Sequence, residues 1–598
     1  MRYLILCLFV FAFSSCNNKN NVERKDNEDL GRLFDNYYNE RMQLLPLEST
    51  QNGDSTNNDK LYADFTDSYR QRLADFFQRN LSLIQKFNRS SLSENDQISY
   101  DIFKREMEIS LQGLSLGIFG NTVLYPDSRY MPFNQFEGVP ISLGQLGSGA
   151  GSQPFKTVRD YDNWLKRASS FGPWCDSAIV YFRKGIAANT VLPAALVKKM
   201  IPEMQAMQVS DVKKSIFYGP IQNMPAGFSK DDRQRLTTDF EQLIRDQIIP
   251  SYKKLTDFLQ NEYLPKARST TGLGALPNGD AYYRFLIRYW TTTEKTPEEI
   301  YQTGLSEVKR IRTIMDSVKN AVGFKGTLNE FFEFMKTDKR FMPYKTPEDV
   351  LNGFRSIQSR IEPHLKKMFS HVPKSPFEIR QTEAFRAASA SAEYVPGSAD
   401  GKRPGIFYVP ILDAKTFNVT SGFESLFLHE AIPGHHYQIS LQQENEKLPK
   451  FRRFAWYGAF GEGWALYCES LGKELGLYTD PYQYMGALGD EIHRAIRLVV
   501  DVGMHTKGMS REQAIKYMMD NEAIPEDGAT AEIERYMAIP AQALSYKIGA
   551  LQIREWRNEF QQQLGTKFSL AAFHDELLKD GCMPLEVAGN KMQQWAKR

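Results

Sequence analysis

The most informative stretch of this sequence covers residues 429–436 and reads His429-Glu430-Ala431-Ile432-Pro433-Gly434-His435-His436. The chain of 598 residues has only eight histidines, and three of them lie here beside a glutamate. A zinc hydrolase needs two or three neutral imidazoles, a carboxylate ligand, an open position for water and a second carboxylate that accepts a proton from that water. The stretch therefore predicts a zinc site with His429 as a ligand and Glu430 as the proton acceptor.

The spacing of these histidines differs from that of the His-Glu-x-x-His motif, in which the second histidine follows four residues after the first on the same helix face. Pro433 occupies that position here. In a regular helix His435 would face about 240° away from His429, and His436 would be in phase but about 10 Å farther along the axis. Pro433 disfavours a regular helix. We therefore expect either a widened turn, permitted by Gly434, that brings His435 into line, or His436 as the second ligand.

The third ligand is expected from a second helix. A suitable segment follows the histidines at a distance that allows a helix, a turn and a returning helix, and it reads Gly461-Glu462-Gly463-Trp464-Ala465-Leu466-Tyr467. Glu462 is the best candidate ligand because its neighbours Trp464 and Tyr467 are typical of a buried helix. Glu469 lies seven residues later on the same face, where it could support a ligand or be an ordinary surface glutamate.

The rest of the chain is mainly helical by pattern. Residues 69–87 and 98–116 read as helices, and three further helix starts carry capping boxes. These boxes pair Thr296 with Glu299, Thr346 with Asp349, and Ser510 with Gln513.

One strand is expected at Gly405–Leu412, which is rich in β-branched and aromatic residues. Pro410 favours an edge strand, because proline cannot donate to a neighbouring strand. The backbone from Gly405 to Tyr408 could then pair with a peptide by strand addition.

Length and charge limit the possible classes of protein. A soft boundary near residue 280 divides an N-terminal helical region, residues 31–280, from a C-terminal region, residues 281–598, that carries the proposed zinc site. The 74 basic and 72 acidic residues nearly cancel, which argues against a nucleic-acid partner. Outside the first 16 residues the cysteines are Cys175, Cys468 and Cys582, an odd number that does not support a disulfide framework.

The first residues are typical of a secretory signal. An apolar run at residues 4–13 is too short to span a bilayer, and two serines precede Cys16. This ending resembles a bacterial lipoprotein signal, residues 1–16, in which Cys16 would carry the lipid and residues 17–30 would form a flexible tether. An ordinary cleaved signal is the alternative. No later segment is apolar and long enough for a transmembrane helix.

The segment from Glu462 to Tyr467 is similar to the Glu-Gly-Phe-Ala-x-Tyr segment that carries the third zinc ligand in aminopeptidase N-like enzymes. Gly434-His435 resembles the Gly-His that ends the His-Glu-Phe-Gly-His motif of thimet-type oligopeptidases. Dipeptidyl peptidase III carries one inserted residue in that motif, and this chain would carry two. The comparison favours His435 over His436.

The whole eight-residue stretch resembles the bacterial family called domain of unknown function 885. Further stretches carry the same resemblance, and they lie at residues 289–300, 403–408, 494–505 and 540–549. The resemblance implies a gluzincin-type zinc metallopeptidase, mainly α-helical and two-lobed like the thimet-type oligopeptidases, with a small edge sheet beside the zinc-binding helix pair and a deep channel. Ala541 departs from the glycine usual in the family, and we expect that departure to be mild.

Related gluzincins use a Tyr or His from a downstream helix to stabilise the oxyanion, which implies this role for Tyr546. Plain core packing is the alternative for this residue. Asp501 and His505 are four residues apart on one expected helix, so they could pair to orient substrate or the metal shell, or serve only structure. Arg535 and Tyr536 could line the cleft, with Arg535 holding a peptide carboxylate or forming only a salt bridge.

The expected function is therefore hydrolysis of short peptides with one Zn²⁺ per chain, by an exported protein that a lipid anchors to the periplasmic or cell-surface face of a membrane. A zinc amidase acting on cell-wall peptides and a non-catalytic peptide-binding lipoprotein are the alternatives. The sequence leaves open the cleavage position, the side-chain preference and the oligomeric state. If His436 is not a ligand, we expect it to contact one of the metal ligands or the substrate.

Overall fold

The computed structural model describes residues 26–118, 128–383, 387, 391–398 and 402–598. The described chain is mainly helical with one small sheet, as the sequence pattern predicts. The predicted signal and Cys16 lie outside the described residues. Within the described part, no helix combines the length and the apolar character needed to cross a membrane.

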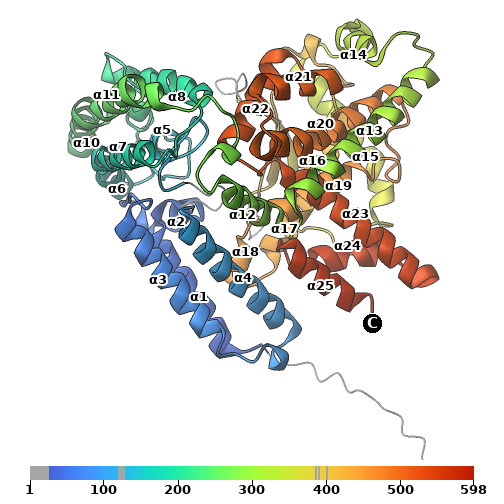
Figure 1. Ribbon diagram of the computed structural model, residues 1–598, viewed down its shortest axis with the longest axis horizontal. Helices are drawn as coiled ribbons and strands as arrows, with labels where there is room; N and C mark the ends of the chain where they lie inside the picture. The colour runs from blue at the N-terminus through green and yellow to red at the C-terminus, as the bar shows by residue number, and fades with distance from the viewer. Residues whose placement is uncertain (1–25, 119–127, 384–386, 388–390, 399–401) are drawn as a thin grey trace, which may run out of the picture.

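The N-terminal region begins with helices that Figure 1 shows side by side in blue. They are α1 (Glu28–Leu44), α2 (Pro46–Gln51), α3 (Asp67–Ile84) and α4 (Glu94–Leu116). The predicted helices at residues 69–87 and 98–116 are confirmed as α3 and α4, apart from a few residues at their ends.

A second group of helices gathers at one side of the molecule (Figure 1). It comprises α5 (Val139–Gly147), α6 (Val158–Ser169), α7 (Phe171–Ala187), α8 (Ala194–Ala206), α9 (Gly219–Gln222), α10 (Lys230–Leu243) and α11 (Ile249–Phe258). Their apolar faces share one buried cluster with residues beyond the predicted boundary near residue 280, among them Ile311, Ile496 and Tyr536. The two regions are thus joined by a common core.

The C-terminal region holds the remaining helices. They are α12 (Gly279–Thr291), α13 (Pro297–Ala321), α14 (Leu328–Thr337), α15 (Pro347–Leu365), α16 (Phe423–Glu430), α17 (His435–Glu444), α18 (Lys450–Arg453), α19 (Gly458–Glu469), α20 (Pro481–Thr506), α21 (Arg511–Asn521), α22 (Glu526–Ala538), α23 (Leu544–Leu564), α24 (Leu570–Leu578) and α25 (Leu585–Trp595). The capping boxes predicted at Thr296, Thr346 and Ser510 are all confirmed, and they begin α13, α15 and α21.

The sheet contains β1 (Phe377–Gln381), β2 (Glu393–Val395) and β3 (Gly405–Val409), in the order β1-β3-β2. β3 pairs parallel to β1 and antiparallel to β2, so the prediction of an edge strand at Gly405–Leu412 is wrong. Pro410 follows the last residue of β3, and its missing N–H therefore interrupts no pairing. Tyr408 faces Arg380 on one side and Glu393 on the other in the register. Because both sides of β3 are occupied, a peptide cannot add to it there.

Glycines allow two central helices, α19 and α23, to pack at very short distance. A Cβ on Gly463 would lie 2.6 Å from the Cα of Gly549, and a Cβ on Gly549 would lie 1.8 Å from the carbonyl oxygen of Ala459. No side chain larger than hydrogen fits at either position. This contact fixes Glu462, beside Gly463, relative to Tyr546, one turn before Gly549.

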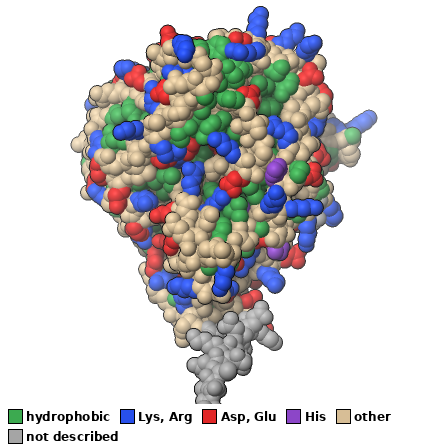
Figure 2. All heavy atoms as spheres, turned by 90° about the vertical axis from the view of Figure 1, so that its right-hand side faces the viewer, with side chains coloured by type: hydrophobic (Ala, Val, Ile, Leu, Met, Phe, Trp, Pro, Cys, Tyr) green, Lys and Arg blue, Asp and Glu red, His purple; other side chains and the backbone are tan. Residues whose placement is uncertain are grey.

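Figure 2 shows one face of the molecule, on which basic and acidic side chains are interspersed. No single-sign surface dominates that face, which agrees with the nearly balanced charge of the chain.

Candidate metal centre

The stretch from His429 to His436 forms a break between two helices. α16 ends at Glu430, and α17 begins at His435. The Nε1 of Trp464 donates a 2.9 Å hydrogen bond to the carbonyl of Pro433 inside the break. The N–H of His436 donates at 3.2 Å to the carbonyl of Ala431, five residues back, so the predicted widened turn lies between the two helices, and the second helix has His435 as its first residue.

Gly434 is required by its surroundings at this break. Its φ is −69°, an ordinary value, so the reason for glycine is space and not the left-handed conformation. A Cβ at this position would lie 1.9 Å from the carbonyl oxygen of His429 and 2.4 Å from that of Leu428. The restart of α17 therefore packs directly on the end of α16.

This contact predicts a large effect of Gly434→Ala. Backbone carbonyls cannot move aside as a flexible side chain can, so we expect a loss of stability of about 3 kcal/mol, at the upper end of usual overpacking costs, together with loss of metal binding. Thermal unfolding and zinc content measure the two effects. Gly489→Ala is the matched control, because a Cβ there meets nothing within 4 Å and alanine is the better helix former. Equal melting temperatures of the two variants would contradict the proposed contact.

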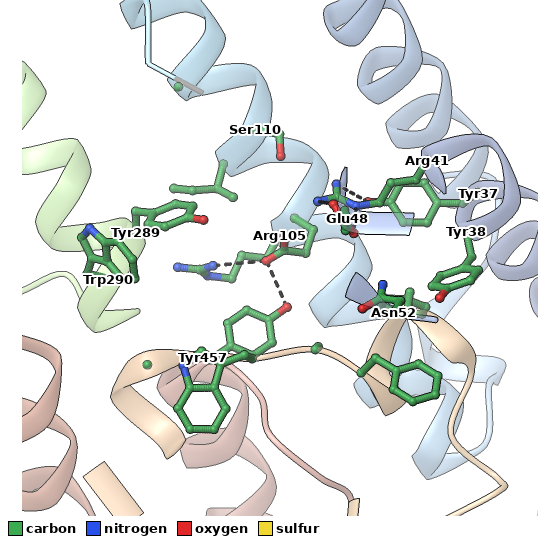
Figure 3. Close-up of a pocket in the computed structure, with 18 of the residues that line it drawn as sticks. Tyr37, Tyr38, Arg41, Glu48, Asn52, Arg105, Ser110, Tyr289, Trp290 and Tyr457 are labelled. Atoms are coloured by element: carbon green, nitrogen blue, oxygen red, sulfur yellow. Dashed lines mark hydrogen bonds and ion pairs between the residues drawn. The ribbon is translucent and has the colours of Figure 1, made fainter. Parts of the chain in front are cut away.

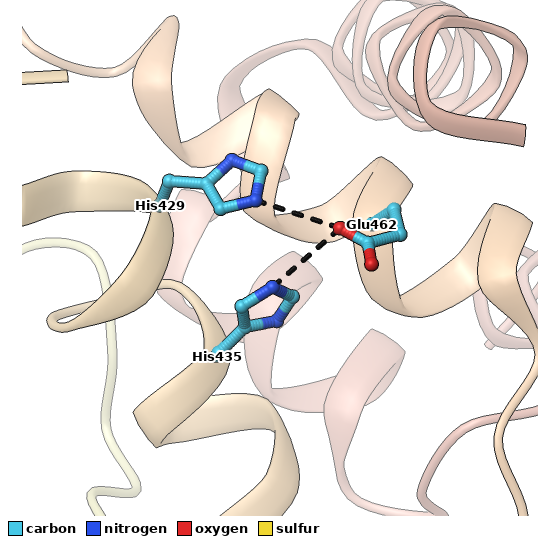
Figure 4. Close-up of side chains that lie close together, drawn as sticks. All are labelled: His429, His435 and Glu462. Atoms are coloured by element: carbon cyan, nitrogen blue, oxygen red, sulfur yellow. Dashed lines mark ion pairs between the residues drawn. The ribbon is translucent and has the colours of Figure 1, made fainter. Parts of the chain in front are cut away.

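Three side chains, two from either side of this break and one from α19, come close together. One ligand atom each from His429, His435 and Glu462 lies within 4.8 Å of the others (Figure 4). The Oε2 of Glu462 is 3.5 Å from the Nε2 of His429 and 3.6 Å from the Nε2 of His435. A tetrahedral zinc site with bonds of about 2.0–2.1 Å places its ligand atoms roughly 3.3–3.5 Å apart. The donor set and the two distances to Glu462 therefore fit one zinc ion.

Glu469 forms a hydrogen bond with the ring nitrogen of His429 that does not face Glu462. Its Oε1 lies 2.7 Å from the Nδ1 of His429, and the guanidinium of Arg494 lies 3.7 Å from the same oxygen. Both Glu469 and His429 are buried. A carboxylate on Nδ1 holds the ring in the orientation and tautomer that present Nε2 to a metal, which is the usual arrangement around zinc-bound histidines.

The electrostatics of the cluster favour a bound cation. Burial alone would lower the pKa of His429, but the carboxylates of Glu462 and Glu469 raise it to about 10. Burial would raise the pKa of Glu462, but His429 and His435 hold it well below its usual range. Positive charge between these groups is thus strongly stabilised, and a divalent metal can replace the protons that they otherwise hold.

Glu430 lies next to this cluster as the last residue of α16. Its side chain is partly exposed and makes no hydrogen bond or ion pair within the described part of the chain. A carboxylate with free acceptor oxygens beside a metal position is what a general base requires.

His436 points away from the cluster toward the sheet. Its Nδ1 lies 2.9 Å from the hydroxyl of Tyr394, and its ring centroid lies 5.0 Å from that of Phe377. Burial lowers the pKa of His436 to about 4, so the ring is neutral. Of the two histidines left open by the sequence, the geometry places His435 beside Glu462.

Tyr546 is held near Glu462 by the packing of α23 on α19. Its ring lies under the guanidinium of Arg497, which is 4.8 Å from the ring centroid. Burial raises the pKa of Tyr546 to about 12, and the carboxylate of Glu462 adds to this shift. The phenol therefore stays protonated at neutral pH and remains a hydrogen-bond donor, with Gln542 as its side-chain partner.

Arg535 and Tyr536 belong to a network around Glu532. Arg535 donates to Glu532 at 2.9 Å and to Gln542 at 2.7 Å, while Tyr536 donates to Glu532 and accepts from Arg497 at 2.9 Å. Arg535 thus belongs to a partly buried ion-pair network. Its binding of a peptide carboxylate stays a prediction.

The sequence reading did not single out Arg494 and Arg497. Arg494 approaches Glu469 and Arg497 covers Tyr546, so both contact groups around the cluster. The sequence feature that could have identified them is the occurrence of two arginines one turn apart in α20, a helix whose later part is buried and largely apolar. Charges that interrupt a buried helix face need partners, which marks such positions.

Asp501 and His505 do not form the expected pair. The carboxylate of Asp501 accepts from the hydroxyl of Tyr283 at 2.6 Å and from the backbone N–H of Ala541. His505 accepts from the N–H of Leu273 at 3.0 Å and donates to the carbonyl of Tyr536 at 3.0 Å. Each residue therefore joins separate segments, because closer partners on neighbouring helices satisfy both side chains. Ala541 has a φ of +68°, which explains why glycine suits this position.

Asp501 gives a pH-dependent prediction. Burial raises the pKa of Asp501 to about 7, whereas an unfolded Asp titrates near about 3.9. Because the folded-state value is the higher one, the stability that Asp501 contributes is full below about pH 4 and is lost as the pH rises through about 7. We expect the melting temperature of Asp501→Asn, relative to the wild type, to rise over this range, by an amount equivalent to at most about 1.4 kcal/mol per pH unit. A difference that does not change with pH would contradict the raised pKa.

Comparisons with known proteins agree with this architecture. The family described as "Bacterial protein of unknown function (DUF885)" matches residues 46–592. The crystal structure of a "putative lipoprotein" from Colwellia psychrerythraea is 27% identical, with a TM-score of 0.87 over 95% of this chain and 99% of that chain. A "putative lipoprotein of unknown function" from Shewanella oneidensis is 19% identical, with a TM-score of 0.73 over 94% and 99% of the two chains. No match was found among curated proteins.

Proposed function

Since the chain belongs to the family described as bacterial protein of unknown function DUF885, we propose that it is a zinc-dependent peptidase of the gluzincin type that hydrolyses short peptides. The convergence of His429, His435 and Glu462 carries this proposal, because two imidazoles and one carboxylate with ligand atoms within 4.8 Å of one another can hold one zinc ion and leave a fourth position open. The carboxylate of Glu469 on His429 adds the outer contact that such a site requires.

A zinc ion bound by these residues supplies a Lewis acid that acidifies water and polarises a carbonyl oxygen. Glu430 accepts the proton that the attacking water loses as its oxygen bonds to the peptide carbonyl carbon. When the C–N bond breaks, Glu430 passes this proton to the leaving amine. Tyr546 donates its phenolic proton in a hydrogen bond to the carbonyl oxygen as negative charge develops there.

The remaining parts of the proposal concern shape and location. We propose that the N-terminal helices α1–α11 and the C-terminal helices α12–α25 act as two lobes around a substrate channel that reaches the metal centre (Figure 1). We also propose export and a lipid anchor on Cys16, which the lipoprotein descriptions of the two similar structures support.

The test is hydrolysis of a panel of short peptides by the purified protein before and after treatment with a chelator. We expect cleavage that disappears on chelation and returns with one equivalent of zinc. Metal-dependent cleavage of cell-wall peptides alone would replace the peptidase by an amidase. Peptide binding without any cleavage in the zinc-loaded protein would replace the enzyme by a binding protein.

A further inference from the structure

A cleft of about 120 Å³, partly open to solvent, reaches Trp456, which lies beside the metal ligand His435. Its walls come from α1, α4 and α12 and from residues 450–458, which lead into α19 (Figure 3). Trp456 borders both sites. Its ring centroid is 5.8 Å from that of His435, and a Cβ on Gly461 would lie 2.2 Å from the Trp456 ring. Trp456 therefore contacts both the cleft and a proposed metal ligand.

Most charged groups in the wall of this cleft are already paired. Arg41 donates two hydrogen bonds to Glu48, at 2.8 and 2.9 Å. Arg105 donates to Glu586 at 2.6 Å and to the carbonyl of Arg288 at 3.0 Å. These bonds use both arginines and Glu48, so none of the three is the natural contact for a charged ligand.

Glu106 is different, because it keeps acceptor capacity. Its Oε1 accepts from the hydroxyl of Tyr457 at 3.0 Å, and the guanidinium of Arg105 is 3.7 Å from the same oxygen. Oε2 makes no hydrogen bond within the described residues, and the side chain is 28% exposed. The cleft therefore presents a carboxylate oxygen that is oriented by Tyr457 and accessible to a ligand.

Aromatic side chains surround this carboxylate. Tyr289 from α12 and Tyr457 from the segment before α19 point into the cleft, with Trp290 beside Tyr289 (Figure 3). Burial raises the pKa of Tyr289, and the negative charge of Glu106 raises it further. The carboxylate of Glu106 is the group in this cleft that attracts a cation, and the hydroxyl of Tyr457 fixes its orientation. The remaining volume suits an apolar or aromatic side chain.

We propose that this cleft binds the N-terminal residue of the peptide substrate, with its α-ammonium donating to Glu106 and its side chain packed against the aromatic wall. The inference rests on the proposed function and deepens it, because it makes free N-termini with apolar or aromatic first residues the preferred substrates. Helices α1 and α4 form the far wall, which limits how much of the peptide can extend beyond the cleft.

The first test is binding of L-phenylalaninamide and of its N-acetyl derivative to the purified protein, measured by calorimetry. We expect the free amine to bind roughly ten- to a hundredfold more tightly, as a charge-assisted hydrogen bond provides. Glu106→Gln should bring the two affinities within about threefold. Glu108→Gln is the matched control and should keep the full difference. Glu108 lies on the same helix, and its ion pair among the described residues is with Lys104.

Equal binding of the two probes to the wild-type protein would overturn the proposal without any variant. A preference that survives in Glu106→Gln would also overturn it. The same comparison with free and acetylated forms of a cleaved peptide should show the preference in KM. Amine-selective binding without cleavage would keep this site while removing the peptidase, and cleavage without amine selectivity would do the reverse.

Discussion

Replacing Glu430 by Gln is expected to lower kcat/KM for a cleaved peptide by about 10²–10⁴-fold while the protein keeps its zinc. Glutamine has nearly the same size but cannot accept the proton that the attacking water loses. Glu430 makes no hydrogen bond or ion pair within the described chain, so the substitution removes no structural contact there. Steady-state hydrolysis and zinc content, measured on the same preparation, give the two quantities.

Glu446→Gln provides the control for this variant. Glu446 is an exposed glutamate just beyond α17, and its replacement should leave kcat/KM unchanged. If Glu430→Gln retained more than about a tenth of the wild-type kcat/KM, below the usual contribution of a general base, Glu430 would not be the proton acceptor.

Tyr546→Phe is the second large effect that we expect, a fall in kcat of about 10²–10³-fold with little change in KM. The substitution removes only the hydroxyl and leaves the ring that packs under Arg497. The hydrogen bond to the developing oxyanion is made in the transition state, so its loss should lie in kcat. Because the pKa of this phenol is about 12, the wild-type donor should remain active well above neutral pH.

The control is Tyr301→Phe, which alters a half-buried tyrosine on α13 beside Lys507. It should keep the wild-type kcat. If Tyr546→Phe changed KM alone, the hydroxyl would contact the substrate without stabilising the transition state.

Local chemistry explains why much of this fold could be predicted from the sequence. A capping box is complete within four residues, so the starts of α13, α15 and α21 could be identified without knowing their surroundings. The candidate cluster could be predicted for a similar reason, because its three donors lie in two short segments of unusual composition.

Long-range pairing set the limit of the prediction. Pro410 suggested an edge strand, but β3 pairs with β1 on one side and with β2 on the other. The sequence of β3 itself does not indicate that these two earlier segments pair with it. Asp501 and His505 were expected to pair with each other because they share a helix face. Instead they form hydrogen bonds with Tyr283 and Leu273, which lie more than two hundred residues earlier in the chain. Glu106 carries no local signal at all, since only the tertiary structure brings α4 near Tyr457.

Zinc bound to the purified wild-type protein and to His435→Ala, after incubation with zinc and removal of the excess, is the decisive measurement for the metal centre. We expect about one zinc per chain in the wild type and a small fraction of that in a folded His435→Ala variant. A folded wild-type protein that retains no zinc, or a His435→Ala variant that retains one full equivalent, would contradict this expectation.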